Sequence, residues 1–150
     1  MLCRITHVVS KVIGYITQQK QSVIQLLVFE HVDVEAGVQV PKGTVEPGEV
    51  LLDAILRELR EETGLAISDR VQYIGSLIRF DQAWNFFAVK GDANLPDTWV
   101  QCVGGDGEDK GMKFRYYWVP LTPEPNLAGK QGDGLELLKN YLSQQTIGEK

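Results

Sequence analysis

The chain has 150 residues, of which 43% are hydrophobic and 23% are charged. This composition excludes a disordered chain and predicts one globular domain over residues 1–150, with enough residues for its own core. Fifteen Lys and Arg against twenty Asp and Glu give a net charge of −5 with no basic run, which excludes a dedicated DNA-binding protein.

The N-terminal third predicts two strands and a shaped loop. Val, Ile, Leu and aromatic residues dominate residues 8–18 and 22–32, and the polar residues 18–21 between them predict a turn. Residues 35–48 hold three glycines and two prolines, and we expect one brief strand there, at 38–40. Structured loops of this kind often carry binding groups.

Residues 49–63 predict the clearest helix of the chain. Its apolar residues recur at spacings of three and four, as one helix face requires: Leu52, Ile55, Leu56 and Leu59. Gly64 follows as a typical helix end.

The remaining chain predicts strands at 71–80, 84–90 and 112–121, with a short strand left open at 99–103. A short amphipathic helix is expected at 135–142. Strands on both sides of a central helix, with a second helix at the end, predict a mixed α+β or α/β sandwich.

The cysteine content and the apolar stretches indicate the cellular compartment in which we expect the protein. Cys3 and Cys102 are too few for a disulfide scaffold, and they lack the paired spacing of a structural zinc site. No apolar stretch approaches the ~18 residues that span a bilayer, and residues 1–6 do not resemble a signal peptide. We expect a soluble cytoplasmic protein with no membrane partner.

Three carboxylates lie along one stripe of the predicted helix, namely Glu58, Glu61 and Glu62. The simplest interpretation is a solvated acidic face. That interpretation fits poorly, because like charges at this spacing repel and acids near the C-terminal end of a helix oppose its dipole. A hard divalent cation such as Mg²⁺ would convert the repulsion into a binding site.

Residues 43–65, GTVEPGEVLLDAILRELREETGL, resemble the complete sequence motif of the Nudix hydrolase family. The motif reads Gly, five residues, Glu, seven residues and Arg-Glu-aliphatic-x-Glu-Glu-x-Gly-aliphatic, and every fixed position matches. The resemblance implies an α+β fold, an α/β/α sandwich in which a mixed β-sheet is flanked by helices. It also implies hydrolysis of a nucleoside diphosphate linked to another group, with Mg²⁺ or Mn²⁺ required.

The resemblance further implies a role for each matching residue. The metal-binding acids of the family correspond to Glu58, Glu61 and Glu62. The backbone carbonyl of Gly43 corresponds to a loop ligand, Arg57 to the residue that orients the acids, and Glu49 to the residue that ties the loop to the helix. Family members differ in which acid serves as the general base, so both Glu58 and Glu61 stay candidates.

Two further candidates lie outside the helix. Lys42 is similar to a lysine near the phosphates in the dinucleoside polyphosphate hydrolases of the family, although the downstream Tyr of that subgroup and the downstream Pro of ADP-ribose hydrolases are absent. Residues 104–111 combine four glycines with three acids, and Glu108 is our choice for an additional metal ligand brought by a mobile loop. The alternative is a solvated connecting loop.

One face of the strand at 112–121 carries Lys113, Arg115 and Tyr117, while Phe114, Tyr116 and Trp118 share the other. Two cations and a phenol suit an anionic nucleotide, and the aromatic face suits the core. The alternative is that Lys113 and Arg115 only solvate an outward face.

The expected partner is a small-molecule nucleotide, such as a dinucleoside polyphosphate or a nucleoside triphosphate. RNA is not expected, because an RNA-end hydrolase would need the basic surface that this chain lacks. A homodimer stays open. The alternative function is a non-catalytic nucleotide-sensing or protein-binding domain of the same fold, but such a domain would be expected to lose motif acids, and none is lost here.

Overall fold

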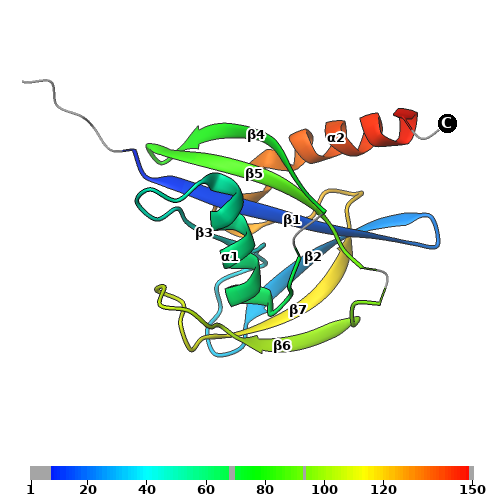
Figure 1. Ribbon diagram of the computed structural model, residues 1–150. Coiled ribbons are helices and arrows are strands. Elements are labelled where there is room, and N and C mark those ends of the chain that lie inside the picture. Colours follow the sequence, from blue (N-terminus) through cyan, green and yellow to red (C-terminus); the bar gives the residue numbers. More distant parts are fainter. Residues whose placement is uncertain (1–7, 68–69, 93, 149–150) are drawn as a thin grey trace, which may run out of the picture.

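The computed structural model describes residues 8–67, 70–92 and 94–148 (Figure 1). The N-terminal segment with Cys3 lies outside the described residues. Within these described residues, seven strands form one sheet: β1 (Ser10–Lys20), β2 (Val23–His31), β3 (Lys42–Thr44), β4 (Val71–Arg79), β5 (Gln82–Lys90), β6 (Thr98–Cys102) and β7 (Lys113–Pro120). Their order is β4-β5-β1-β2-β7-β6, with β3 paired to β1 off this path. The pairing of β1 with β5 is parallel and the others are antiparallel, so the sheet is mixed.

The helices lie on opposite faces of this sheet (Figure 1). Helix α1 (Leu51–Thr63) contacts β1, β3 and β6, whereas α2 (Leu135–Gly148) contacts β4 and β5 and follows a 3₁₀ segment, η1 (Ala128–Gly134). Side chains alternate along β1, so Val12 and Ile16 join the core under α1, while Ile13 and Tyr15 join the core under α2. The expected α/β/α sandwich is therefore confirmed.

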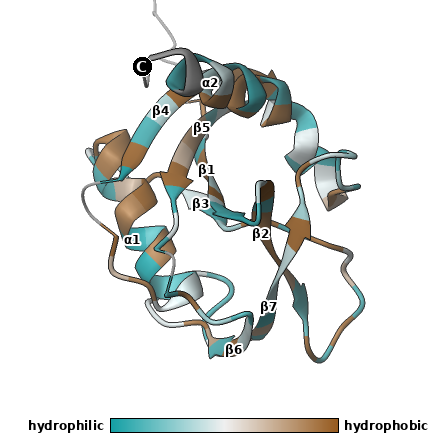
Figure 2. Cartoon of the chain, turned by 90° about the vertical axis from the view of Figure 1, so that its right-hand side faces the viewer, coloured by the Kyte–Doolittle hydropathy of each residue, from teal (hydrophilic) through white to brown (hydrophobic). Residues whose placement is uncertain are grey.

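The buried face of helix α1 includes acidic residues as well as apolar ones. The ends of the helix follow from local sequence, since the chain turns at Gly48 before it and Gly64 closes it in a left-handed conformation. Its buried face is rotated from the predicted one, because Leu52 is 47% exposed whereas Glu62 is 3% exposed. Figure 2 shows hydrophobic and hydrophilic residues on both helices. The helix thus turns part of its acidic stripe toward the protein.

Some predicted boundaries were wrong. The first strand runs on to Lys20, and its turn lies at Gln21 and Ser22, because backbone pairing continues past the apolar residues. The brief strand predicted at 38–40 is reduced to a single β-bridge between Gln39 and Phe29, and the strand of this segment lies at 42–44, where it pairs with β1. The C-terminal helix is longer than predicted, and the strand left open at 99–103 exists as β6.

The site forms where strand β1 changes its pairing partner. Its N-terminal half pairs with β3, and its C-terminal half pairs with β2, so β3 takes the place that β2 leaves. This arrangement sets the backbone of Lys42 and Gly43 directly beside α1, which contacts β3. Among the described residues, no helix is both long and apolar enough to cross a membrane.

Candidate active site

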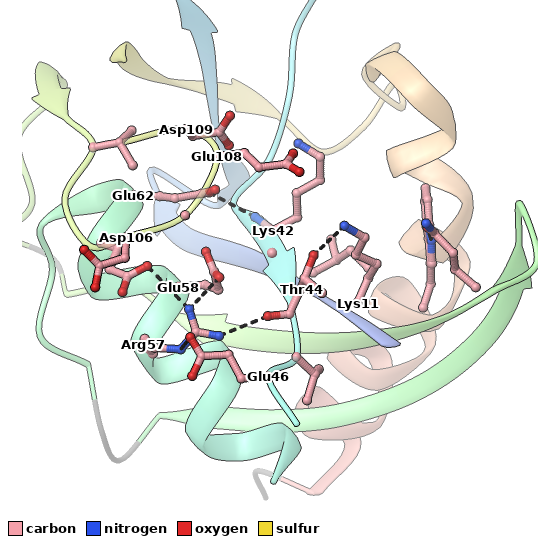
Figure 3. A pocket seen from close by; sticks show the side chains of 18 of the residues that line it. Lys11, Lys42, Thr44, Glu46, Arg57, Glu58, Glu62, Asp106, Glu108 and Asp109 are labelled. Atoms are coloured by element: carbon pink, nitrogen blue, oxygen red, sulfur yellow. Dashed lines mark hydrogen bonds and ion pairs between the residues drawn. The ribbon is translucent and has the colours of Figure 1, made fainter. Parts of the chain in front are cut away.

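A pocket of about 870 Å³ lies between β3, α1, the loop that joins β6 to β7, and η1. This volume is typical of small-molecule sites. Seven of the residues predicted from sequence line it, from three separate segments: Lys42, Gly43, Arg57, Glu58, Glu61, Glu62 and Glu108 (Figure 3). The fold therefore brings the acidic stripe, the β3 backbone and the glycine-rich loop to one place.

The carboxylates of α1 are held in a poorly solvated environment. Glu58 is 9% exposed and Glu62 is 3% exposed. Burial raises the pKa of Glu58, although the neighbouring Arg57 opposes this. Burial likewise raises the pKa of Glu62 well above its usual range, and the charge of Lys42 opposes it. A cation in the pocket would favour the ionised form of both acids.

Arg57 ties the loop before α1 to the helix. Its Nε and Nη2 atoms donate to the two carboxylate oxygens of Glu49, each at 2.9 Å, and Nη2 also donates to the carbonyl of Thr44 at 3.0 Å. The Glu49 carboxylate accepts the backbone N–H of Glu46 at 3.0 Å as well. These hydrogen bonds, chiefly that from Arg57, lower the pKa of Glu49. Glu49 and Arg57 therefore join the loop before α1 to the helix through hydrogen bonds.

The third guanidinium nitrogen of Arg57 reaches the acidic stripe. Nη1 donates to Glu58 Oε1 at 2.7 Å and to Glu61 Oε2 at 3.4 Å. Because the guanidinium is planar and fully engaged, it fixes the direction of both carboxylates. Arg57 is therefore placed to orient the acids before any ligand binds.

Two glycines let other backbone segments approach these acids. A Cβ atom on Gly43 would overlap the carboxylate of Glu58, and one on Gly105 would overlap that of Glu61. The backbone N–H of Lys42 donates to Glu62 Oε2 at 3.1 Å, and that of Gly104 donates to the carbonyl of Glu61 at 3.0 Å. Only glycine permits such close contact between backbone and carboxylate.

The glycine-rich loop brings three acids to the pocket: Asp106, Glu108 and Asp109. Glu108 is exposed, whereas Asp109 is partly buried, and the charge of Asp109 contributes to raising the pKa of Glu58 and Glu62. Glu108 was the predicted ligand of this loop, and Asp109 was not predicted, although it lies in the same acidic segment.

The predicted nucleotide face of β7 does not reach this pocket. Arg115 Nη2 lies 3.5 Å from Glu30 Oε2, and the Tyr117 hydroxyl donates to the same oxygen at 3.2 Å. Lys113 is exposed on the same strand. Arg115 and Tyr117 meet at Glu30 on β2, and none of the three residues lines the pocket.

The far wall of the pocket holds residues that were not predicted to belong to the site. Lys11 on β1 donates from Nζ to Thr44 Oγ1 at 2.6 Å. Trp84, assigned mostly to the core, is 7% exposed but also lines the pocket, and its indole N–H donates to Gln82 Oε1 at 3.0 Å. The pairing of β1 with β3 and β5 sets Lys11 between Thr44 and Trp84. No local pattern in the sequence reveals such long-range neighbours.

The donor set fits a hard divalent cation. Carboxylate and carbonyl oxygens are the ligands that Mg²⁺ and Mn²⁺ prefer. Because Gly43 has no side chain, its backbone lies directly against the buried carboxylate of Glu58. Within the described residues, no three His, Cys, Asp or Glu side chains are already gathered as a metal cluster. Instead, the Arg57 guanidinium donates hydrogen bonds to the carboxylates of Glu58 and Glu61.

The chain is similar to known proteins over most of its length. The model of the family described as NUDIX domain matches residues 8–135. The RNA pyrophosphohydrolase of Bradyrhizobium sp. (strain ORS 278) is 30% identical over 115 residues, covering 66% of this chain and 68% of that protein. The RNA pyrophosphohydrolase of Rhodopseudomonas palustris (strain BisB18) is 27% identical over 117 residues, covering 66% of this chain and 65% of that protein. The chain thus spans about two thirds of the length of these curated relatives.

Solved structures share the fold at low sequence identity. The NUDIX domain of Shewanella oneidensis NrtR, complexed with ADP ribose, has a TM-score of 0.68 at 13% identity and covers 91% of this chain and 90% of that chain. An Ap4A hydrolase of C. elegans has a TM-score of 0.61 at 15% identity and covers 89% of this chain and 98% of that chain. The family model spans most of the chain, and the pocket is built around the complete motif. The chain therefore belongs to the Nudix family of hydrolases, which act on phosphoric anhydride bonds.

Proposed function

We propose that this chain is a metal-dependent pyrophosphohydrolase that cleaves a nucleoside diphosphate linked to another group, by attack of water on a phosphorus atom. The main support for this proposal is the composition of the pocket. Buried acids of α1 converge with the Gly43 backbone in a pocket that also holds two lysines, Lys11 and Lys42. Such a pocket suits a divalent cation together with an anionic phosphate chain.

The residues that would hold the cation are the Gly43 carbonyl and the acids of the stripe, namely Glu58, Glu61 and Glu62. Glu108 would add a ligand from the loop, with Asp109 beside it. When bound, Mg²⁺ or Mn²⁺ neutralises phosphate oxygens and lowers the pKa of a bound water.

The side chains of the pocket supply the remaining steps. Arg57 holds Glu58 and Glu61 in fixed directions, so that either carboxylate can accept the proton of the attacking water. Burial raises the pKa of Glu58, which favours acceptance of a proton by its carboxylate. Lys11 and Lys42 offer positive charge to the phosphates from the opposite side of the pocket.

The favoured substrate is a small nucleotide, either a dinucleoside polyphosphate or a nucleoside triphosphate. Support comes from the pocket volume and from the structural neighbours, whose names include an Ap4A hydrolase and a domain complexed with ADP ribose. A second candidate is the 5′-triphosphate end of RNA, because the curated relatives are named RNA pyrophosphohydrolases. The net charge of −5 favours the small nucleotide.

A substrate panel tests this proposal. Phosphate or pyrophosphate release would be measured with Mg²⁺ and with Mn²⁺ on nucleoside triphosphates, dinucleoside polyphosphates, nucleotide sugars, ADP-ribose and a short 5′-triphosphate RNA. We expect turnover of at least one small nucleotide, with RNA cleaved more slowly. Faster cleavage of RNA would favour the second candidate. Binding of nucleotides without turnover of any would favour the non-catalytic alternative.

A further inference from the structure

Two buried glutamines lie next to Lys42, and one of them, Gln131, lines the pocket. Gln39 precedes β3 and is 7% exposed, and Gln131 belongs to η1 and is 3% exposed. Neither belongs to the sequence motif. Buried amides require hydrogen-bond partners. The hydrogen bonds of these two amides form a chain from η1 to Lys42.

The hydrogen bonds orient both amides. Gln39 Nε2 donates to the carbonyl of Ala36 at 3.3 Å, so its Oε1 atom faces Lys42 and accepts from Nζ at 2.9 Å. Gln131 Oε1 accepts the backbone N–H of Val40 at 2.9 Å, so its Nε2 atom donates to the same Gln39 oxygen at 3.3 Å. The Gln39 carbonyl oxygen is thus shared between Gln131 and the Lys42 ammonium.

The pair rests on rigid parts of the fold. The backbone of Gln39 forms two hydrogen bonds with Phe29 on β2, both at 2.9 Å. The hydroxyl of the fully buried Tyr15 donates to the backbone carbonyl of Gln131 and accepts the N–H of Gly134 at 3.2 Å. Both amides are therefore anchored from the sheet, and the atom they present to Lys42 has a fixed position.

The partner of the ammonium is neutral, and this matters for an anionic ligand. A carboxylate in the place of Gln39 would also accept from Lys42, but it would cancel the charge of Lys42 and repel phosphate. An amide holds the ammonium without cancelling its charge. Figure 3 shows the Lys42 side chain extending from β3 into the pocket.

We propose that Gln39, supported by Gln131, is a positioning residue that holds the Lys42 ammonium as a ligand for a phosphate group of the substrate. The inference rests on the proposed function of the pocket and goes beyond it by naming residues outside the motif. It requires that Gln39 act through Lys42 alone.

Equilibrium binding of ADP in EDTA, measured by titration calorimetry, tests the inference without turnover. Four proteins form a double-mutant cycle: the parent, Gln39→Met, Lys42→Met and the double variant. We expect Lys42→Met to weaken ADP binding about tenfold and Gln39→Met to weaken it severalfold. In the Lys42→Met background, Gln39→Met should change the affinity less than about twofold.

A charge variant completes the test. Gln39→Glu keeps the acceptor and should weaken ADP binding by about tenfold with little change in melting temperature. The matched control is Gln25→Glu, because Gln25 Oε1 accepts from the Gln18 amide at 2.8 Å outside the pocket. Equal losses from Gln39→Met in both backgrounds, parent-like binding by Gln39→Glu, or no ADP binding by the parent would overturn the inference. A parent that binds ADP in this way but hydrolyses no substrate would contradict only the proposed function.

Discussion

The buried side chain of Glu62 places a carboxyl in the candidate active site and lowers the folding stability of the metal-free protein at neutral pH. Burial raises the pKa of this carboxyl well above the usual 4.5. An acid with a higher pKa in the folded state binds more protons there than in the unfolded chain. The free energy of unfolding therefore falls as pH rises from about 4.5 toward the folded-state value. Above that range, the ionised Glu62 destabilises the metal-free protein.

We predict that Glu62→Gln stabilises the metal-free protein at neutral pH, because the amide has no charge to bury. In EDTA at pH 7.5 its melting temperature should exceed that of the parent by about 3 °C or more, and the difference should shrink at pH 5. Glu49→Gln is the matched control with the opposite sign, because Arg57 lowers the pKa of Glu49. Equal melting temperatures for Glu62→Gln and the parent at both pH values would contradict the burial argument.

Gly43 is the residue at which backbone and acid come closest. In Gly43→Ala the added Cβ would overlap the Glu58 carboxylate, so Glu58 must move out of its pair with Arg57. We predict that turnover falls at least about tenfold while the circular dichroism spectrum is unchanged. Gly107→Ala is the control, since a Cβ there meets no atom within 4 Å although Gly107 also lines the pocket. Similar turnover for the two variants would count against the close packing at Gly43.

Among the elements, the 104–111 loop carries the most direct prediction. Glu108→Gln should lower turnover by well over tenfold with little change in melting temperature, and the loss should be greatest at low Mg²⁺. Asp109→Asn should have a similar effect, because the charge of Asp109 already acts on Glu58 and Glu62. Steady-state rates across a Mg²⁺ titration measure both.

The control for the loop is Asp97→Asn, which removes an exposed carboxylate paired with Lys20 outside the pocket. If Glu108→Gln and Asp109→Asn both match Asp97→Asn at every Mg²⁺ concentration, the loop only connects β6 to β7. If Asp109→Asn alone is impaired, the ligand assignment moves from Glu108 to Asp109.

Helix α1 marks how far the sequence could predict an element. Its C-terminal end follows from Gly64 and was predicted correctly, whereas the helix begins at Leu51, two residues later than predicted. Which of its faces is buried depends on the surface it meets. Because β3 and the glycine-rich loop lie against the acids, Glu62 is buried and Leu52 is exposed, which the apolar spacing alone did not indicate.

The far wall of the pocket shows why the rest of the site was not predictable. Lys11, Trp84 and Gln131 are separated by 47 or more positions along the chain, and pairing across the sheet and the placement of η1 bring them to one pocket. No residue spacing records that arrangement. The motif residues were identifiable because one helix and its preceding loop hold nearly all of them.

Across the fold, the pairing of β1 with β3 and the packing of β3 against α1 bring Lys11 and Lys42 to the pocket that the acids of α1 line. A phosphate chain bound between these lysines and the acids would meet a cation held by acids on one side and ammonium groups on the other. This separation of charge is what the proposed hydrolysis of an anhydride bond requires.

The metal dependence of hydrolysis is best measured as the rate of phosphate release against Mg²⁺ concentration, on the best substrate of the panel. We predict no turnover in excess EDTA and recovery of turnover on addition of Mg²⁺ or Mn²⁺. Glu61→Gln should reduce the rate at saturating Mg²⁺ by at least about a hundredfold. Full activity in excess EDTA, or an unchanged rate for Glu61→Gln, would contradict the proposed metal-dependent mechanism.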